Sequence, residues 1–175
     1  MVHMYHDPVK GRNSIADNWV NVPVFGKQPE VPAWVIRESA YLLAMREDGC
    51  LAVVRTGQGT FLPGGGIECG ETPQEAITRE ALEECGLIIQ PGTPVVRAIQ
   101  FVYAEQEKTH FEKRSIFLDG VIVGFDSKCC EPDHELVWVE AGEATRILSH
   151  ESQRWVVDQW QAGKLSRPKR ERTKL

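Results

Sequence analysis

One stretch of this 175-residue chain, residues 64–87, leaves little freedom for its fold. It begins with three consecutive glycines, which let the backbone turn tightly and approach other groups closely. Thr72, Pro73 and Glu75 then form a helix start, because Thr can cap the helix, Pro suits its first position and Glu completes a capping box. The glycine that follows Cys85 is a natural helix end. The pattern predicts a glycine-rich loop followed by a helix from Pro73 to Cys85.

The predicted helix and the loop before it concentrate negative charge. Six glutamates surround a single cation, Arg79, in this stretch: Glu68, Glu71, Glu75, Glu80, Glu83 and Glu84. Because each helical residue turns by about 100°, Glu83 and Glu84 lie on either side of Glu80, one turn further along. Like charges at this spacing repel each other. A divalent cation would remove the repulsion, and carboxylate oxygens favour a hard ion such as Mg²⁺ or Mn²⁺.

The spacing of these residues resembles the Nudix box, a fixed series of glycines, glutamates and one arginine. The matching residues are Gly65, Glu71, Arg79, Glu80, Ala81, Glu83, Glu84, Gly86 and Leu87. Seven of them are of fixed type, so a chance match in this chain is rarer than about one in a million. A larger aliphatic residue is commoner at the position of Ala81, which is a packing position. The chain therefore resembles the Nudix hydrolases, which include MutT-like proteins.

This resemblance implies an α/β fold, specifically a Nudix-type α/β/α sandwich around a mixed β-sheet. We expect a partly packed N-terminal arm over residues 1–34, a Nudix hydrolase domain over residues 35–163 and a basic, disordered tail over residues 164–175. Apolar runs and turn residues predict further elements. These are a hairpin of residues 39–45 and 50–54, a loop over 57–66, strands over 95–103, 115–125 and 136–139, and helices over 141–148 and 151–161.

The resemblance also implies a reaction, in which water attacks phosphorus in a nucleoside diphosphate derivative with the help of Mg²⁺ or Mn²⁺. The substrate expected first is a (deoxy)nucleoside triphosphate, cleaved to a monophosphate and pyrophosphate, with dinucleoside polyphosphates and ADP-sugars as alternatives. A non-catalytic nucleotide-sensing module is the alternative of another class. The implied metal ligands are the carbonyl of Gly65 and the carboxylates of Glu80, Glu83 and Glu84. The implied catalytic residues are Glu80 or Glu84, which would orient or deprotonate water, and Arg79 and Glu71, which would hold the cluster together.

A further carboxylate ligand is often found outside the box in this family. In this chain Glu131, Asp133 and Glu135 stand before a late predicted strand and are candidates, with Glu131 and Glu135 foremost. A solvated acidic loop explains the same residues equally well. His134, in their midst, is interpreted as incidental.

Four residues are candidates for contact with the substrate. Phe61 precedes the glycines and could line a base pocket, although packing explains it as well. Lys113 and Arg114 could reach a phosphate, but exposed cations are common. Tyr103 lies sixteen residues after the box, where a tyrosine resembles the dinucleoside-polyphosphate branch of the family.

Composition narrows the remaining classes. A net charge of −5 makes general nucleic-acid binding improbable, although the basic tail could contact RNA and the arm a second copy in a homodimer. Five cysteines without a CxxC pair predict neither a disulfide framework nor a zinc site, and favour a reducing compartment. No secretory signal or membrane-length apolar run is visible, so we expect a cytoplasmic protein.

Overall fold

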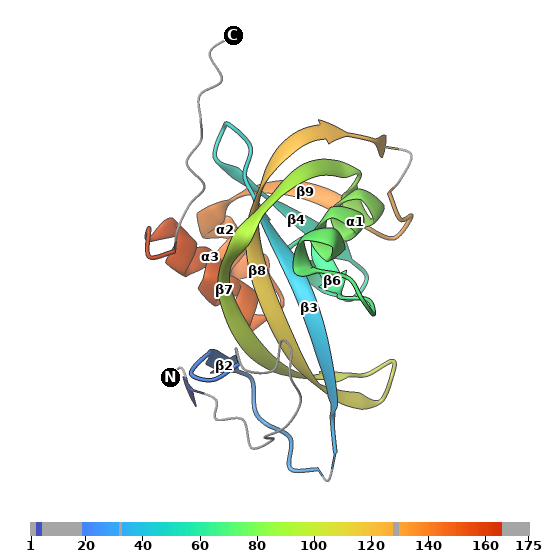
Figure 1. Cartoon of the computed structure of the whole chain (residues 1–175), viewed down its shortest axis with the longest axis vertical. Helices are drawn as coiled ribbons and strands as arrows, with labels where there is room; N and C mark the ends of the chain where they lie inside the picture. Colours follow the sequence, from blue (N-terminus) through green and yellow to red (C-terminus); the bar gives the residue numbers. More distant parts are fainter. Residues whose placement is uncertain (1–2, 5–18, 32, 128–129, 166–175) are drawn as a thin grey trace.

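The computed structural model describes residues 3–4, 19–31, 33–127 and 130–165 (Figure 1). Residues 5–18 of the predicted arm, residues 166–175 of the predicted tail and Cys129 lie outside the described residues. The elements in chain order are β1 (His3–Met4), β2 (Pro23–Phe25), β3 (Val35–Ala44), β4 (Cys50–Thr56), β5 (Gly59–Phe61), β6 (Gly64–Gly66), α1 (Pro73–Cys85), β7 (Leu87–Ala104), β8 (Thr109–Phe125), β9 (Glu135–Glu140), α2 (Ala141–Ile147) and α3 (Glu151–Gln161).

Two sheets form the middle layer. The larger runs in the order β1-β2-β7-β8-β3-β6, and the smaller in the order β5-β4-β9. Strand β3 is parallel to β8, whereas β7 and β6 are antiparallel to their neighbours β8 and β3, so the larger sheet is mixed. Helix α1 lies to one side of the strands, and α2 and α3 lie to the other (Figure 1). The predicted α/β/α sandwich is thereby confirmed.

Strand β3 runs through the centre of both cores. Its last six residues, 39–44, are all buried, as expected of a strand that is covered on both faces. Leu42 belongs to the cluster that includes Ile77 of α1, whereas Leu43 belongs to the cluster that includes Val156 of α3. Alternate side chains of one strand therefore attach helices to opposite faces of the sheet.

The predicted hairpin of residues 39–45 and 50–54 is wrong. The chain does reverse between Arg46 and Cys50, but an isolated bridge between Met45 and Leu51 is all that pairs these two segments in the described structure. Strand β3 pairs instead with β8 along its whole length, and β4 pairs with β9. The turn was visible in the sequence, whereas the better partners are far away along the chain.

The predicted loop over residues 57–66 is also wrong in part, because it contains the short strands β5 and β6. The glycines of β6 pair with residues 39–41 of β3. Gly64 has a φ of +133°, and a Cβ there would clash with the carbonyl oxygen of Ala40. These glycines therefore allow β6 to approach β3 closely as an edge strand.

The helix predictions are confirmed most closely. Helix α1 has the predicted bounds, and the Thr72 hydroxyl accepts a hydrogen bond from the Glu75 N–H (3.2 Å) while the Glu75 carboxylate accepts one from the Thr72 N–H (2.8 Å). Gly86 follows in the left-handed conformation, with a φ of 67°. Helix α3 also has the predicted bounds, and α2 ends one residue early, at Ile147.

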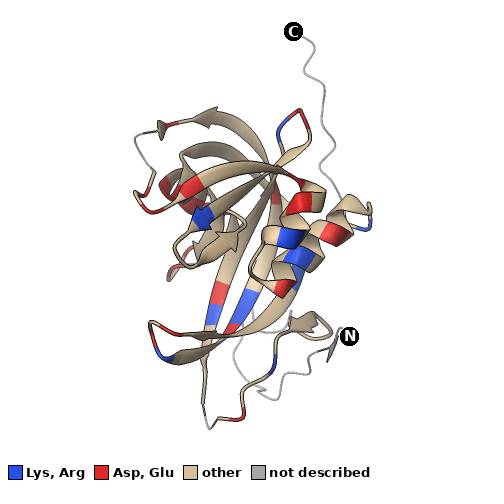
Figure 2. Cartoon of the chain, turned by 180° about the vertical axis from the view of Figure 1, so that it is seen from behind, with Lys and Arg blue, Asp and Glu red and all other residues tan. Residues whose placement is uncertain are grey.

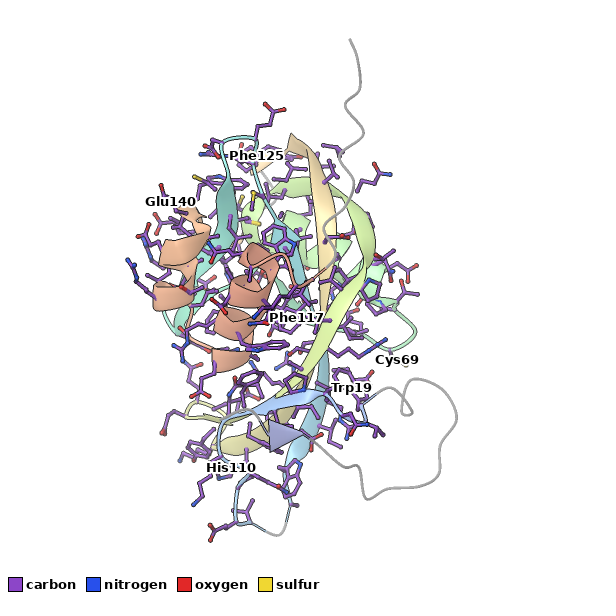
Figure 3. All side chains as sticks on the ribbon, turned by 90° about the vertical axis from the view of Figure 1, so that its left-hand side faces the viewer. Trp19, Cys69, His110, Phe117, Phe125 and Glu140 are labelled. Atoms are coloured by element: carbon purple, nitrogen blue, oxygen red, sulfur yellow. The ribbon has the colours of Figure 1, made fainter. Side chains whose placement is uncertain are left out.

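The described parts of the arm and the tail contact the domain. Trp19 is fully buried in the core on the α1 side (Figure 3), and β2 adds to the larger sheet beside β7. Leu165 packs against the core on the opposite face. The described cysteines are free thiols: Cys50, Cys69, Cys85 and Cys130. Among the described residues, no helix is long and apolar enough to cross a membrane.

Candidate active site

The acidic face of α1 meets the edge of the larger sheet. Helix α1 packs against β7, β6 and β3, and its Glu84 carboxylate accepts a hydrogen bond from the Gly64 N–H of the glycine strand. The capping box and the close packing of β6 therefore fix both sides of the candidate site.

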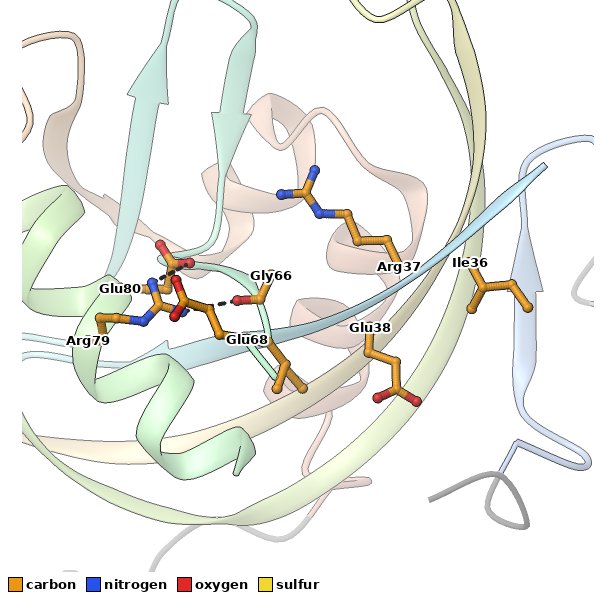
Figure 4. A pocket seen from close by; sticks show the side chains of 8 residues that line it. Ile36, Arg37, Glu38, Gly66, Glu68, Arg79 and Glu80 are labelled. Carbon is orange, nitrogen blue, oxygen red and sulfur yellow. Dashed lines mark hydrogen bonds and ion pairs between the residues drawn. The ribbon is translucent and has the colours of Figure 1, made fainter. Parts of the chain in front are cut away.

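Arg79 holds the carboxylates of this face in place (Figure 4). Its guanidinium donates two parallel hydrogen bonds to Glu71, from Nε to Oε1 (2.9 Å) and from Nη2 to Oε2 (3.0 Å). Nη2 also donates to the carbonyl of Gly66 (3.0 Å), and Nη1 lies 3.0 Å from Glu80 Oε1 and 3.2 Å from Glu83 Oε2. The hydrogen bonds from Arg79 lower the pKa of Glu71, so this partner stays ionised.

Glu84 lies in a different environment from Glu71. Its Oε2 accepts a hydrogen bond from the Gly64 N–H (2.8 Å), which favours the ionised form. Burial nevertheless raises the pKa of Glu84 to about 8, and the charges of Glu80 and Glu131 act in the same direction. Burial also raises the pKa of Glu80. Without a cation, this cluster holds more negative charge than its surroundings compensate.

The donor set fits a hard divalent ion. Three carboxylates (Glu71, Glu80 and Glu83) share the single guanidinium of Arg79, and burial raises the pKa of Glu80 and of the neighbouring Glu84. The Glu80 carboxylate also lies so near Gly65 that a Cβ on this glycine would clash with it. Carboxylate and backbone oxygens in such proximity are the ligands that Mg²⁺ and Mn²⁺ prefer.

The three acidic candidates before β9 lie in different places. The Glu131 N–H donates to the carbonyl of Glu83 (2.8 Å), which brings this loop against the end of α1. The Glu135 carboxylate lies 3.0 Å from Arg55 on the neighbouring strand β4, and 65% of its side chain is exposed. Asp133 lines the cavity described below, with 80% of its side chain exposed. Glu131 is therefore the candidate that joins the box glutamates.

Interpreted from the sequence as incidental, His134 lies among these carboxylates in the structure. Its Nδ1 lies 2.9 Å from Glu131 Oε2, and its Nε2 lies 3.5 Å from Glu84 Oε1. The imidazole thus stands between a box carboxylate and a loop carboxylate. Its position among three acidic residues in the sequence was a signal, but the contact depends on how the loop docks against α1.

A cavity of about 450 Å³ opens beside the glutamates. Residues from several elements line it, including Arg37, Tyr41, Phe61, Glu84, Lys113 and His134. A second cavity, of about 360 Å³, shares Arg37 and Gly66 with the first and is lined by Arg79 and Glu80 (Figure 4). The carboxylate cluster therefore borders two adjoining spaces that a substrate could occupy.

The four substrate candidates fall into two groups. Phe61 and Lys113 line the larger cavity, and the Phe61 ring packs against His150 with a centroid distance of 4.9 Å. Arg114 is buried and its Nε donates to Glu112 (2.7 Å). The ring of Tyr103 packs against His110, outside both cavities, and is 46% exposed.

Comparison with known proteins agrees with this geometry. The NUDIX domain family model matches residues 26–161, so the chain belongs to the NUDIX family. A segment is 47% identical over 47 residues to the ADP-ribose pyrophosphatase of Methanocaldococcus jannaschii, covering 27% of this chain and 25% of that protein. Another match is 44% identical over 50 residues to a MutT-like protein of Streptomyces ambofaciens, covering 27% of this chain and 32% of that protein. The matches thus span about a quarter to a third of these relatives.

The fold is similar to that of solved family members. A NUDIX hydrolase from Nitrosomonas europaea superimposes with a TM-score of 0.59 at 19% sequence identity, covering 74% of this chain and 90% of that chain. At this level of identity the similarity establishes the common fold, and the chemistry has to be argued from the residues of the site.

Proposed function

We propose that this chain is a metal-dependent pyrophosphohydrolase that cleaves the diphosphate linkage of a nucleoside diphosphate derivative. The first substrate class to test is the (deoxy)nucleoside triphosphates, which would give a monophosphate and pyrophosphate. The observation that carries the proposal is the network of Arg79, which gathers Glu71, Glu80 and Glu83 at the edge of the smaller cavity. A helix face that had no need of a cation would gain nothing from this crowding of charge.

The residues that would hold the ion are the carboxylates Glu80, Glu83 and Glu84 and the carbonyl of Gly65, with Glu131 as a further candidate. When bound, Mg²⁺ or Mn²⁺ supplies positive charge to the phosphate oxygens and lowers the pKa of water. Side chains of the protein carry out proton transfer and hold the reacting groups in position. Glu84 is the better-placed candidate for the base, because its carboxylate lines the larger cavity beside Gly64. Arg79 keeps Glu80 and Glu83 in place while the phosphorus–oxygen bond to the leaving group breaks.

The test is hydrolysis of a substrate panel with Mg²⁺ or Mn²⁺. The panel would contain canonical and oxidised deoxynucleoside triphosphates, dinucleoside polyphosphates, ADP-ribose, nucleotide sugars and capped RNA. We expect metal-dependent product formation from at least one class, and a loss of at least about 100-fold in Glu83→Gln, as is typical for removal of a group that acts in catalysis. Glu143→Gln, on the exposed surface of α2, is the matched control.

The alternative, a nucleotide-sensing module, predicts another result. Nucleotides would bind with measurable affinity, but no member of the panel would be turned over by the wild-type protein. That result, with a folded protein and metal present, would contradict the proposed hydrolase activity.

A further inference from the structure

The larger cavity has charges of opposite sign on different parts of its wall. Glu84 and Asp133 contribute carboxylates from α1 and from the loop before β9. Arg37 on β3 and Lys113 on β8 contribute cations. The box accounts for Glu84, but it assigns nothing to these two cations.

Strand pairing places the two cations side by side. Arg37 and Lys113 are register partners on the parallel strands β3 and β8, so their backbones lie about 4.8 Å apart. Basic segments lie next to each other on these strands in Figure 2. Two neighbouring positive charges repel each other, and a bound anion would relieve that repulsion.

Neither cation is neutralised by a close carboxylate. Within the residues that the structure describes, Arg37 and Lys113 form no ion pair at 4.0 Å or less. Burial, followed by the charge of Arg37, lowers the pKa of Lys113 to about 8, whereas Glu107 in the β7–β8 turn acts in the opposite direction. Lys113 also contributes to the lowered pKa of His150, which burial chiefly causes. The environment of Lys113 therefore favours an additional negative group.

The cations also lie close enough to the glutamates for one ligand to reach both. The Arg37 side chain extends over Gly66. A Cβ added to this glycine would stand only 3.3 Å from the Arg37 guanidinium. Gly66 is next to Gly65, whose carbonyl is a proposed metal ligand. Burial chiefly raises the pKa of Tyr41, which lines the same cavity from β3, and among nearby charges Glu84 raises this pKa further whereas Arg37 lowers it.

We propose that Arg37 and Lys113 bind an anionic group of the substrate beyond the two phosphates that flank the hydrolysed bond. This inference rests on the proposed function and narrows its substrate class. The cation pair favours a substrate whose leaving group carries more than one phosphate, as in a nucleoside triphosphate or a dinucleoside polyphosphate. A nucleotide sugar, whose leaving group carries one phosphate and an uncharged ring, would leave the cation pair without a ligand.

Direct binding of inorganic triphosphate tests this assignment without turnover. Calorimetric titration at low ionic strength, with EDTA present, excludes any contribution of a metal ion at the glutamates. We expect the wild-type protein to bind, and Arg37→Gln and Lys113→Gln to bind at least about tenfold more weakly, as expected for loss of a charge-assisted hydrogen bond. Lys113→Arg, which keeps the charge, should bind more tightly than Lys113→Gln. Lys164→Gln, after α3, is the control for a general loss of charge.

A kinetic comparison distinguishes the possible sources of the anion. In the same variants, the KM for ATP or for diadenosine tetraphosphate should rise at least about tenfold relative to the KM for ADP-ribose. If the KM rises for ATP alone, the cation pair binds a terminal phosphate. If the KM rises for diadenosine tetraphosphate alone, the cation pair binds an internal phosphate.

The outcome that overturns the proposal is clear in each arm. An anion subsite at this place is contradicted if the wild-type protein does not bind triphosphate. It is also contradicted if Arg37→Gln and Lys113→Gln bind triphosphate as tightly as the wild type, or if Lys164→Gln weakens binding as much as they do. If no nucleotide is hydrolysed, the proposed function fails, but the binding titration still decides this inference. Circular dichroism of each variant shows that the fold is retained.

Discussion

Replacement of Glu84 by glutamine is expected to lower turnover at least about 100-fold and, at alkaline pH, to stabilise the metal-free protein. The activity falls because the amide neither holds a cation as a carboxylate does nor accepts a proton. The fold is kept because the amide oxygen can still accept the hydrogen bond from the Gly64 N–H. Steady-state kinetics and thermal unfolding in EDTA measure the two effects on the same preparation.

The stability effect depends on pH in a direction that the raised pKa determines. The pKa of Glu84 is about 8 in the folded protein, compared with an ordinary value of 4.5. Between these values the unfolded chain ionises while the folded protein retains the proton, so the wild-type protein loses stability as pH rises from about 4.5 to 8. Glutamine does not titrate. The melting temperature of the variant should therefore exceed that of the wild type at pH 8.5, and the difference should disappear near pH 4.5.

A matched variant separates this effect from a general loss of negative charge. Glu143→Gln removes an exposed carboxylate from α2, and neither activity nor the pH dependence of stability should change. If Glu84→Gln were equally destabilising at both pH values, the raised pKa would not describe this site.

Replacement of Arg79 by lysine is expected to reduce turnover by about 100-fold although the charge is conserved. Lysine cannot make the two parallel hydrogen bonds to Glu71 and also reach the Gly66 carbonyl, Glu80 and Glu83. The carboxylates would then move apart, and small displacements of catalytic groups are costly. Because 25% of the Arg79 side chain is exposed, solvent screening limits the loss in unfolding free energy to about 1–2 kcal/mol.

Urea unfolding and kinetics of the Arg79→Lys variant measure these two quantities. Arg146→Lys, at the exposed end of α2, makes the same chemical change outside the site and should behave as the wild type. Activity within about threefold of wild type in Arg79→Lys would show that a point charge suffices, and the positioning role would be wrong.

The sequence predicts α1 and its acidic face well because the relevant forces are local. Thr72, Glu75 and Gly86 interact with the backbone of their own helix, so their spacing alone determines where it begins and ends. Glu80, Glu83 and Glu84 are spaced by three and four residues, so they must share one face of any helix over this segment. The family model then confirms the resemblance that this spacing suggests.

Strand pairing was harder to predict because it depends on distant parts of the chain. The turn at Gly49 suggested a hairpin, but β3 pairs with β8, 76 residues further along the chain. Arg37 and Tyr41 were missed as cavity residues for a related reason. Their spacing places them on one face of a strand, but the sequence does not say which face meets the cavity.

The most direct test of the site is whether the carboxylates of α1 bind a divalent cation. We would titrate Mn²⁺ into the protein and follow the free ion by electron paramagnetic resonance. We expect the wild-type protein and Glu143→Gln to bind with the same affinity, and Glu83→Gln to bind at least about tenfold more weakly, because an oxygen ligand loses its charge. Equal affinity for Mn²⁺ in Glu83→Gln and the wild type would contradict a cation site on this helix face.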